Sequence, residues 1–239
     1  MSEWFTRWFG KEYLDIYPHR DEREARSVVR MIRNTIPLRA DGRALDLACG
    51  AGRYTRTLCA HIWTVGLDLS MELLEVAIAE SPHIPYVRAD MRALPIGDCR
   101  FDLVVNLFTS FGYFSSDDQN REVLTEVRRV LAHDGVFVLD YLNASHVRSA
   151  LIPHDRRRIG GRDVTQDRWI TPDGRYVEKR ITAAGPQQSF TERVRMFEPD
   201  DLRCMLHDSG LVVDREFGNY ASGPLDATNP RAIFFAHRG

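Results

Sequence analysis

The chain of 239 residues is 44% hydrophobic, and its 32 lysines and arginines nearly balance its 34 aspartates and glutamates. This length and apolar content suit one large domain or a domain with an insertion, while a formal net charge of -2 excludes a whole-chain electrostatic argument for a nucleic-acid or anionic membrane partner. The four cysteines lack C-x-x-C spacing and the eight histidines lack paired spacing, so we expect a reducing compartment and no metal site.

The N-terminal stretch MSEWFTRWFGKEYLDIY has no basic region followed by a long apolar core, and no later apolar run approaches the ~20 residues that a membrane helix needs. We therefore expect a cytoplasmic protein with no membrane partner. Trp4, Phe5, Trp8 and Phe9 recur at helical spacing and form one apolar face. That face suits docking on the core or a homodimer contact.

A helix is predicted over residues 23–35, where Val28, Val29 and Ile32 follow helical spacing and Pro37 ends the pattern. Short apolar strands then alternate with helical patterns, which is typical of a parallel sheet with right-handed crossovers. The runs FDLVVNLF and GVFVLDYL suit strands covered on both faces. We expect strands over 44–48, 64–69, 85–88, 101–107 and 136–141, and helices over 53–60, 71–80 and 120–131. The predicted fold class is an open α/β fold.

The pattern changes after Asn143. Within residues 156–197 the turn signal at Thr171 to Gly174 separates two stretches rich in β-forming residues, and QQSFTERVRMF could supply a third strand. We expect an antiparallel β flap inserted late in the parallel domain. A helix over 199–209 and strands over 212–217 and 231–237 then return the chain to the main sheet.

The stretch ALDLACGAGRYT, residues 44–55, places two glycines directly after a buried strand that carries a carboxylate. Gly50 and Gly52 would let a ligand approach the backbone. A dinucleotide fingerprint needs a third glycine three positions after the second, and Thr55 stands there instead. The loop therefore predicts a bound ligand other than a dinucleotide.

Three acids lie in or after successive predicted strands. Asp68, in VGLDLS, can accept hydrogen bonds from both hydroxyls of a ribose, and Asp90, in VRADMRALP, can accept from an exocyclic adenine amine. Asp46 lies in the first strand, where it can orient the glycine loop and favour a cationic ligand. Because open parallel sheets bind ligands beyond the carboxyl ends of their strands, the set predicts a ligand with an adenosine half and a positive charge.

In this order, LDLACGAGRYT, GLDLS, ADMRALP, FDLVVNLFTSFGYF and LAHDGVFVLDYLN resemble the motifs of class I S-adenosylmethionine-dependent methyltransferases. The resemblance runs from about Ala44 to Asn143 with the two closing strands. It implies a Rossmann-like seven-stranded open sheet of order 3-2-1-4-5-7-6 with strand 7 antiparallel, helices on both faces, and a small antiparallel β insertion after strand 5. The implied parts are an N-terminal lid or helical segment (1–40), the cofactor-binding core (41–145 and 199–239) and the inserted flap (146–198).

The resemblance also implies S-adenosyl-L-methionine as cofactor, S-adenosyl-L-homocysteine as product, and roles for individual residues. Gly50 and Gly52 would approach the methionine part, Asp68 would bind the ribose, and Asp90 with Met91 would border adenine. Ala48 and Asn106 would supply carbonyls near the methionine ammonium, and Arg20 a bidentate pair to its carboxylate. The complete expected cofactor set is Arg20, Asp46, Ala48, Cys49, Gly50, Gly52, Asp68, Leu69, Ser70, Asp90, Met91, Arg92, Asn106, Leu107 and Phe108.

The family places its acceptor beside the stretch that follows the fourth strand, here residues 108–114. The N/D-P-P-Y/F-type motif of enzymes that act on DNA bases or protein amides is absent, and the stretch resembles the T/S-S-x-G of methyltransferases acting on small amines, amino sugars or other metabolites. We expect methyl transfer to N or O of a small molecule by in-line displacement. Tyr13, Tyr17, Tyr113 and Tyr220 are candidate acceptor-positioning residues with no general base assigned, and Phe111 and Tyr141 are further candidates for the pocket.

Three alternatives remain open. An RNA or protein methyltransferase could use the arginines of the insertion, Arg156, Arg157, Arg158, Arg162 and Arg168, as a patch for phosphates or an acidic partner, although nearby aspartates could equally make these arginines a solvated strand face. A non-catalytic regulatory subunit would bind the cofactor without a closed acceptor pocket. The N-terminal stretch could fold over the cofactor as a lid, or it could be only a packing arm.

Overall fold

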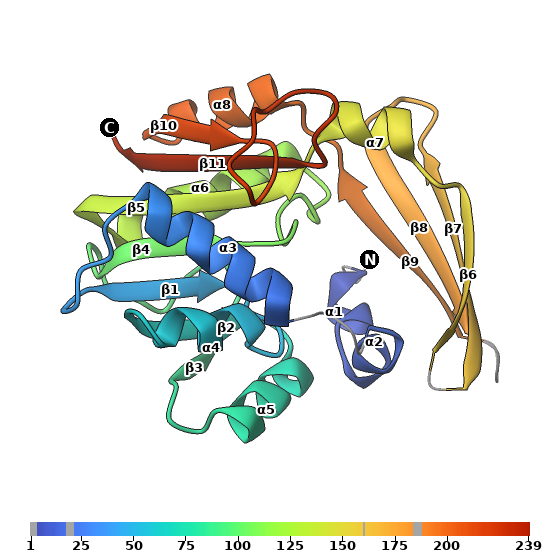
Figure 1. Cartoon of the computed structure of the whole chain (residues 1–239), viewed down its shortest axis with the longest axis horizontal. Helices are drawn as coiled ribbons and strands as arrows, with labels where there is room; N and C mark the ends of the chain where they lie inside the picture. The colour runs from blue at the N-terminus through green and yellow to red at the C-terminus, as the bar shows by residue number, and fades with distance from the viewer. Residues whose placement is uncertain (1–3, 18–21, 160, 184–187) are drawn as a thin grey trace.

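The computed structural model describes residues 4–17, 22–159, 161–183 and 188–239. A seven-stranded sheet forms its centre, in the order β10-β11-β5-β4-β1-β2-β3 (Figure 1). All neighbouring pairs from β5 to β3 are parallel, whereas β11 runs antiparallel to both β5 and β10. This confirms the order and the antiparallel last strand that the resemblance implied. The strands are β1 (Arg43–Leu47), β2 (Trp63–Asp68), β3 (Tyr86–Arg88), β4 (Phe101–Asn106), β5 (Leu131–Leu142), β10 (Leu211–Phe217) and β11 (Arg231–Arg238).

Helices cover both faces of this sheet. On one face, α3 (Glu22–Thr35) and α4 (Arg53–Cys59) bury residues such as Val28 and Leu58 against β1, β4 and β11. On the other face, α6 (Asp117–Val130) and α8 (Pro199–Asp208) pack Val127 and Leu206 on the alternate residues of the same strands. The strands alternate between two apolar faces, which explains their continuous apolar runs.

A four-stranded antiparallel sheet, which we call the flap, follows β5 in the chain. Its strands are β6 (His154–Ile159), β7 (Arg162–Ile170), β8 (Tyr176–Ala183) and β9 (Gln188–Arg195), in that order across the sheet. A short helix, α7 (Ala144–Ala150), leads into it. Sequence analysis missed both α7 and β6. The six residues of β6, HDRRRI, carry charge on most positions and bury only Ile159, so they show no hydrophobic alternation.

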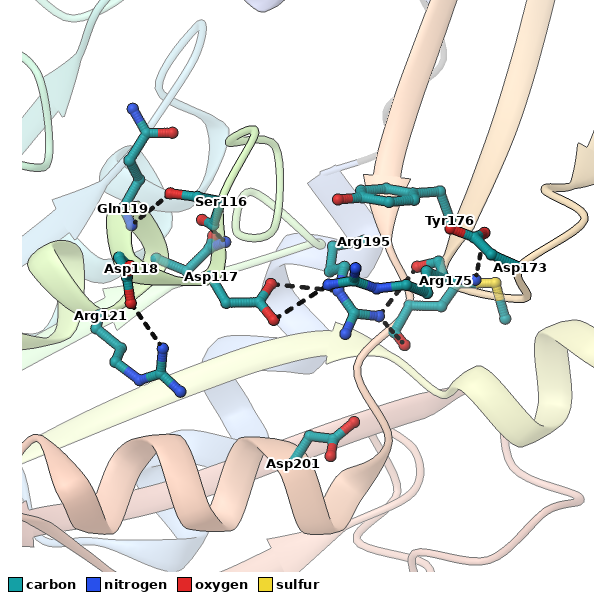
Figure 2. Close-up of polar contacts among 12 residues, drawn as sticks. Ser116, Asp117, Asp118, Gln119, Arg121, Asp173, Arg175, Tyr176, Arg195 and Asp201 are labelled. Carbon is teal, nitrogen blue, oxygen red and sulfur yellow. Dashed lines mark hydrogen bonds and ion pairs between the residues drawn. The ribbon is translucent and has the colours of Figure 1, made fainter.

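The flap is tied to the main domain at the N-terminus of α6. The carboxylate of Asp117 accepts from the Arg195 guanidinium at 3.2 Å and pairs with Arg175 at 3.5 Å (Figure 2). The backbone N–H of Arg195 also donates to the carbonyl of Gly112, and its carbonyl accepts from the Tyr141 hydroxyl. The last strand of the flap is thereby joined to the loop that follows β4.

The N-terminal arm, defined here as residues 4–17, contains α1 (Phe5–Trp8) and α2 (Lys11–Ile16) and lies between the main sheet and the flap (Figure 1). The Trp8 indole N–H donates to Glu192 of β9 at 2.7 Å, and the Trp8 ring packs on Phe190 with ring centroids 4.4 Å apart. On the opposite side, the Ser70 hydroxyl donates to the Phe9 carbonyl at 2.5 Å. The arm therefore bridges the flap and the loop that follows β2. Within the described residues, no helix is both long and apolar enough to cross a membrane.

Candidate functional site

A cavity of about 390 Å³ opens at the carboxyl ends of β1, β2 and β4. Its lining comes from the arm, the glycine loop after β1 with the start of α4, the end of β2 with the helix α5 (Met71–Glu80), the loop after β3 and the loop after β4. Its volume is in the range of small-molecule sites, and its position is the one where open α/β sheets bind ligands.

The two glycines of the first loop differ in what surrounds them. Gly50 lines the cavity at φ 56°, and a Cβ there would meet only Leu73 at 3.8 Å, so the backbone is open to a ligand. Gly52 does not line the cavity, and a Cβ there would lie 2.6 Å from the hydroxyl of Tyr86. Sequence analysis assigned both glycines to ligand approach. In the structure, the absence of a side chain at Gly52 serves packing against Tyr86.

Asp68 ends β2, lines the cavity and is 9% exposed. One carboxylate oxygen accepts from the amide of Gly50 at 2.7 Å, and the other accepts from the amide of Ser70 at 2.8 Å. Each oxygen keeps a further lone pair for a hydroxyl donor. Burial raises the pKa of Asp68, and these amide bonds oppose the rise. Leu69 also lines the cavity, whereas Ser70 lies behind it and joins Asp68 to the arm.

Asp46 lies in β1, is 1% exposed and lines the cavity. Its carboxylate accepts from the Thr55 hydroxyl at 2.6 Å, and burial raises its pKa to about 7. The residue that breaks the dinucleotide fingerprint thus hydrogen-bonds a buried acid. Ala48 and Cys49 also line the cavity, and burial raises the pKa of the Cys49 thiol, which keeps it neutral.

Asp90 and Met91 follow β3 and line the cavity, and Arg92 lies beside them but outside its wall. The Arg92 guanidinium donates to Asp90 at 2.6 Å, and its backbone amide does so at 2.9 Å. Burial favours the neutral acid, but the hydrogen bonds and charge of Arg92 outweigh it and lower the pKa of Asp90. The carboxylate is ionised at neutral pH and can accept a further donor.

Leu107, Phe108, Ser110, Tyr113 and Phe114 bring the loop after β4 into the cavity wall. Asn106, by contrast, lies outside that wall. Its side-chain N–H donates to the carbonyl of Leu47 at 3.0 Å, and its Oδ1 has no partner among the described residues.

Three aromatic residues predicted for the pocket lie elsewhere. Phe111 and Tyr141 are fully buried and pack around Phe197, and the Tyr220 hydroxyl donates to the buried carboxylate of Asp140 at 2.9 Å. None of the three lines the cavity. Alternation along a strand cannot say which of two apolar faces an aromatic residue joins, which is why Tyr141 was misplaced.

The arm covers the cavity with Phe5, Phe9, Tyr13, Leu14 and Tyr17. The rings of Tyr13 and Tyr17 are 5.1 Å apart, and Phe9 stacks on Tyr113 at 5.6 Å. The predicted arm tyrosines and Tyr113 therefore share one wall. Arg20 lies outside the described residues.

Several cavity residues have no counterpart in the sequence predictions. Arg53 begins α4, Arg56 lies one turn further along the same helix, and Glu80 ends α5. Arg53 pairs with Glu24 at 2.8 Å and lies over the Phe108 ring at 4.7 Å. The available signal was the position of both arginines on one helix face directly after the glycine loop.

Comparisons with known proteins place the chain among methyltransferases. A family model described as a methyltransferase domain matches residues 44–135. The dTDP-4-amino-2,3,4,6-tetradeoxy-D-glucose N,N-dimethyltransferase of Saccharopolyspora spinosa is 29% identical over 224 residues, which cover 90% of this chain and 85% of that protein. The demethylmenaquinone methyltransferase of Thermotoga maritima is 30% identical over 179 residues, which cover 73% of this chain and 72% of that protein.

A solved structure has a similar fold. CalS10 from Micromonospora echinaspora, an amino pentose methyltransferase involved in calicheamicin biosynthesis and solved with S-adenosylmethionine bound, matches with a TM-score of 0.72 and 24% identity. The match covers 96% of this chain and 97% of that one.

Proposed function

Because this chain belongs to the class I S-adenosylmethionine-dependent methyltransferases, we propose that it methylates the nitrogen of a small-molecule acceptor, an amino sugar carried on a nucleotide. The observation that carries the proposal is the cavity itself, which combines carboxylates at the ends of neighbouring strands with a cover of tyrosines from the arm. A relative that acts on a dTDP-linked amino sugar and a solved amino pentose methyltransferase support this acceptor class.

The residues in the cavity fit the cofactor. Asp68 has lone pairs for two ribose hydroxyls, Asp90 with Met91 would border adenine, and the open backbone at Gly50 would accept the methionine part. Asp46 would favour the ammonium by charge, and Arg53 would face the carboxylate. When bound, the cofactor supplies a methyl group on a sulfonium.

The arm would shape the acceptor end of the cavity. Methyl transfer to a neutral nitrogen creates no oxyanion, so positioning and exclusion of water can supply much of the rate. Tyr13, Tyr17 and Tyr113 offer apolar cover, electron-rich faces for a cation and phenolic oxygens that can orient an amine. No histidine is among the described residues that line the cavity, and an amine that arrives deprotonated needs no general base.

We also propose the division into a lid (1–40), a cofactor-binding core (41–145 and 199–239) and an inserted flap (146–198). The arginine-rich flap does not favour the alternative of an RNA substrate. Arg156 pairs with Asp163 of the neighbouring strand at 2.8 Å, and Arg157 pairs with Asp155 of its own strand at 2.8 Å, so acids on β6 and β7 offset these positive charges. Such pairs are typical of a solvated strand face.

Turnover on a panel of acceptors tests the proposal. The purified protein is incubated with S-adenosylmethionine and dTDP-linked 3-amino and 4-amino deoxysugars, their 3-hydroxy and 4-hydroxy counterparts, and demethylmenaquinone. Mass spectrometry then follows S-adenosylhomocysteine and the methylated acceptor. We expect methylation of an amino sugar and none of its hydroxy counterpart. Methylation of only the hydroxy sugars or only the quinone contradicts the proposal.

Asp68→Ala is the control variant for that assay, because it should bind the cofactor more weakly. Loss of two charge-assisted hydrogen bonds to ribose should weaken cofactor binding by roughly 1.5–3 kcal/mol per bond. Calorimetry with S-adenosylhomocysteine measures the loss, and circular dichroism checks the fold. Unchanged affinity in a folded variant would remove the ribose assignment.

A further inference from the structure

The loop after β4 contains two consecutive residues other than glycine in the left-handed region, Phe108 at φ 59° and Thr109 at φ 62°. Residues with a Cβ rarely adopt this conformation, and they keep it only where the surrounding structure holds them. Phe108 lines the cavity, and so does Ser110, the residue that follows the pair. The strained pair is therefore part of the wall of the site.

Asp140, near the end of β5, binds both amides of the pair. Its Oδ2 accepts from the N–H of Phe108 at 2.9 Å, and its backbone carbonyl accepts from the N–H of Thr109 at 2.9 Å. Asp140 is fully buried. Burying a carboxylate is costly unless it is paired and hydrogen-bonded, so Asp140 needs further partners inside the sheet.

Arg231 and Tyr220 are those partners. The Arg231 guanidinium donates to Asp140 Oδ1 at 2.7 Å and to the Thr109 hydroxyl at 3.1 Å. The Tyr220 hydroxyl donates to Asp140 Oδ2 at 2.9 Å. Arg231 begins β11, which pairs antiparallel with β5, so the last strand of the chain brings a cation to the acid that holds the loop.

We propose that Asp140, fixed by Arg231 and Tyr220, is a positioning residue for methyl transfer that keeps Phe108 and Ser110 in the cavity wall. The inference rests on the proposed function, and it gives Tyr220 a role although this residue does not line the cavity. Asp140 does not line the cavity and acts through the loop. Without it, Phe108 and Thr109 return to ordinary backbone angles and the wall changes shape.

Asp140→Asn tests the hold on the loop directly. The amide has the size of the carboxylate, but an NH₂ group takes the place of one oxygen. In the place of Oδ2 it leaves both the N–H of Phe108 and the Tyr220 hydroxyl without their acceptor, and in the place of Oδ1 it faces the Arg231 guanidinium, which is also a donor. We expect amide hydrogen exchange in the peptide 106–114 to become roughly tenfold faster, with exchange in β1 unchanged. Asp214→Asn is the matched control, because Asp214 pairs with His237 of β11 at 2.8 Å on the surface of the same sheet. It should leave exchange and turnover unchanged.

We expect Asp140→Asn to slow turnover by changing the loop after β4, while the overall fold stays intact. For Asp140→Asn we expect kcat on the amino-sugar acceptor to fall about tenfold or more, while the affinity for S-adenosylhomocysteine stays within about threefold. Adding Thr109→Gly, which adopts a positive φ without strain, should restore part of kcat in the double variant. If Asp140→Asn does not fold, Tyr220→Phe removes a single bond to Asp140 and should show the same pattern more weakly.

Unchanged exchange in peptide 106–114 refutes the inference. So does a parallel loss of affinity and kcat that Thr109→Gly does not rescue. Hydrogen exchange needs no acceptor, so it tests the hold on the loop even where the wild-type protein methylates no amino sugar. A wild-type protein that methylates no amino sugar contradicts the proposed function but leaves this inference standing.

Discussion

Asp46 shows how one buried acid can make ligand binding depend on pH. Its pKa lies near 7 in place of the ordinary 3.8, because burial penalises the charged form more than the Thr55 hydroxyl stabilises it. The folded protein therefore holds this proton more tightly than the unfolded chain does. Between about pH 4 and pH 7, Asp46 is ionised in the unfolded chain but still protonated in the folded protein. The free energy of unfolding therefore falls as the pH rises through this range, and the loss levels off above it.

A cationic cofactor favours ionised Asp46, so we expect the affinity for S-adenosylmethionine to rise between pH 6 and pH 8, by up to about tenfold per unit below the pKa. Calorimetry across this range measures the slope. Asp46→Asn should flatten it, whereas Asp41→Asn, at an exposed acid just before β1, should leave it in place. A slope that survives Asp46→Asn assigns the titration to another group.

The sequence could predict which residues at the ends of strands lie in the cavity wall. Asp68, Asp90 and Gly50 follow short strands whose pattern is local, and all three line the cavity. Phe5 and Phe9 line it too, because the arm docks there, whereas the sequence indicated only that these rings suit docking on the core or a dimer contact. The roles of all these residues in binding stay predictions.

At the scale of elements, the arm is held from two sides. Trp8 donates to Glu192 of the flap, and Phe9 accepts from Ser70, which also donates its amide to Asp68. Tyr17 lies where the arm meets the flap, with Lys179 5.1 Å from its ring centroid and Gln166 3.5 Å from its hydroxyl. An element held in this way can act as a lid and contribute to stability at once.

We expect Tyr17→Phe to bind cofactor nearly normally and to slow methyl transfer, because the ring stays in the cavity wall while the hydroxyl that can orient the acceptor is lost. Deletion of the first ~20 residues should impair both binding and turnover by opening the site to water. Single-turnover assays and calorimetry on both variants measure these effects. Tyr176→Phe, on the flap beneath Arg193, is the control for loss of a tyrosine hydroxyl. A normal rate for Tyr17→Phe would leave the arm as packing only.

Most elements of the main sheet could be predicted because their signals are local. The helix predicted over 199–209 is α8, Pro199–Asp208, and the strand predicted over 101–107 is β4, Phe101–Asn106. The first flap strand, β6, is exposed on most of its residues, so its pairing with β7 decides its structure and its composition does not. Tertiary pairing of this kind leaves no periodic trace in the sequence.

At the scale of the whole molecule, Asp117 joins the flap to the main domain through Arg195 and Arg175 (Figure 2). The neighbouring acid on the same helix turn, Asp118, pairs only locally with Arg121 at 3.0 Å and is largely exposed. The two aspartates share the helix N-terminus and differ in whether they bridge two parts of the fold.

Asp117→Asn should therefore lower stability by about 1–2 kcal/mol, because it weakens a partly buried pair whose Arg195 side chain is only 12% exposed. For a chain of this size that corresponds to a fall in Tm of roughly 2–8 °C. Differential scanning calorimetry compares it with Asp118→Asn, which should change Tm by much less. Equal effects of the two substitutions would show that helix-terminal charge, and not flap attachment, accounts for the loss.

The bond from Trp8 to Glu192 joins residues 184 positions apart. During synthesis on the ribosome, the arm is made before the flap, and its docking surface on β9 appears only 184 residues later. At 5–20 residues per second, the aromatic face of the arm waits roughly 10 to 40 seconds for its partner. The cavity can therefore close only late in translation. In a nascent chain that stalls before β9 is made, the aromatic face of the arm has no docking surface and stays available to chaperones; that face consists of Trp4, Phe5, Trp8 and Phe9.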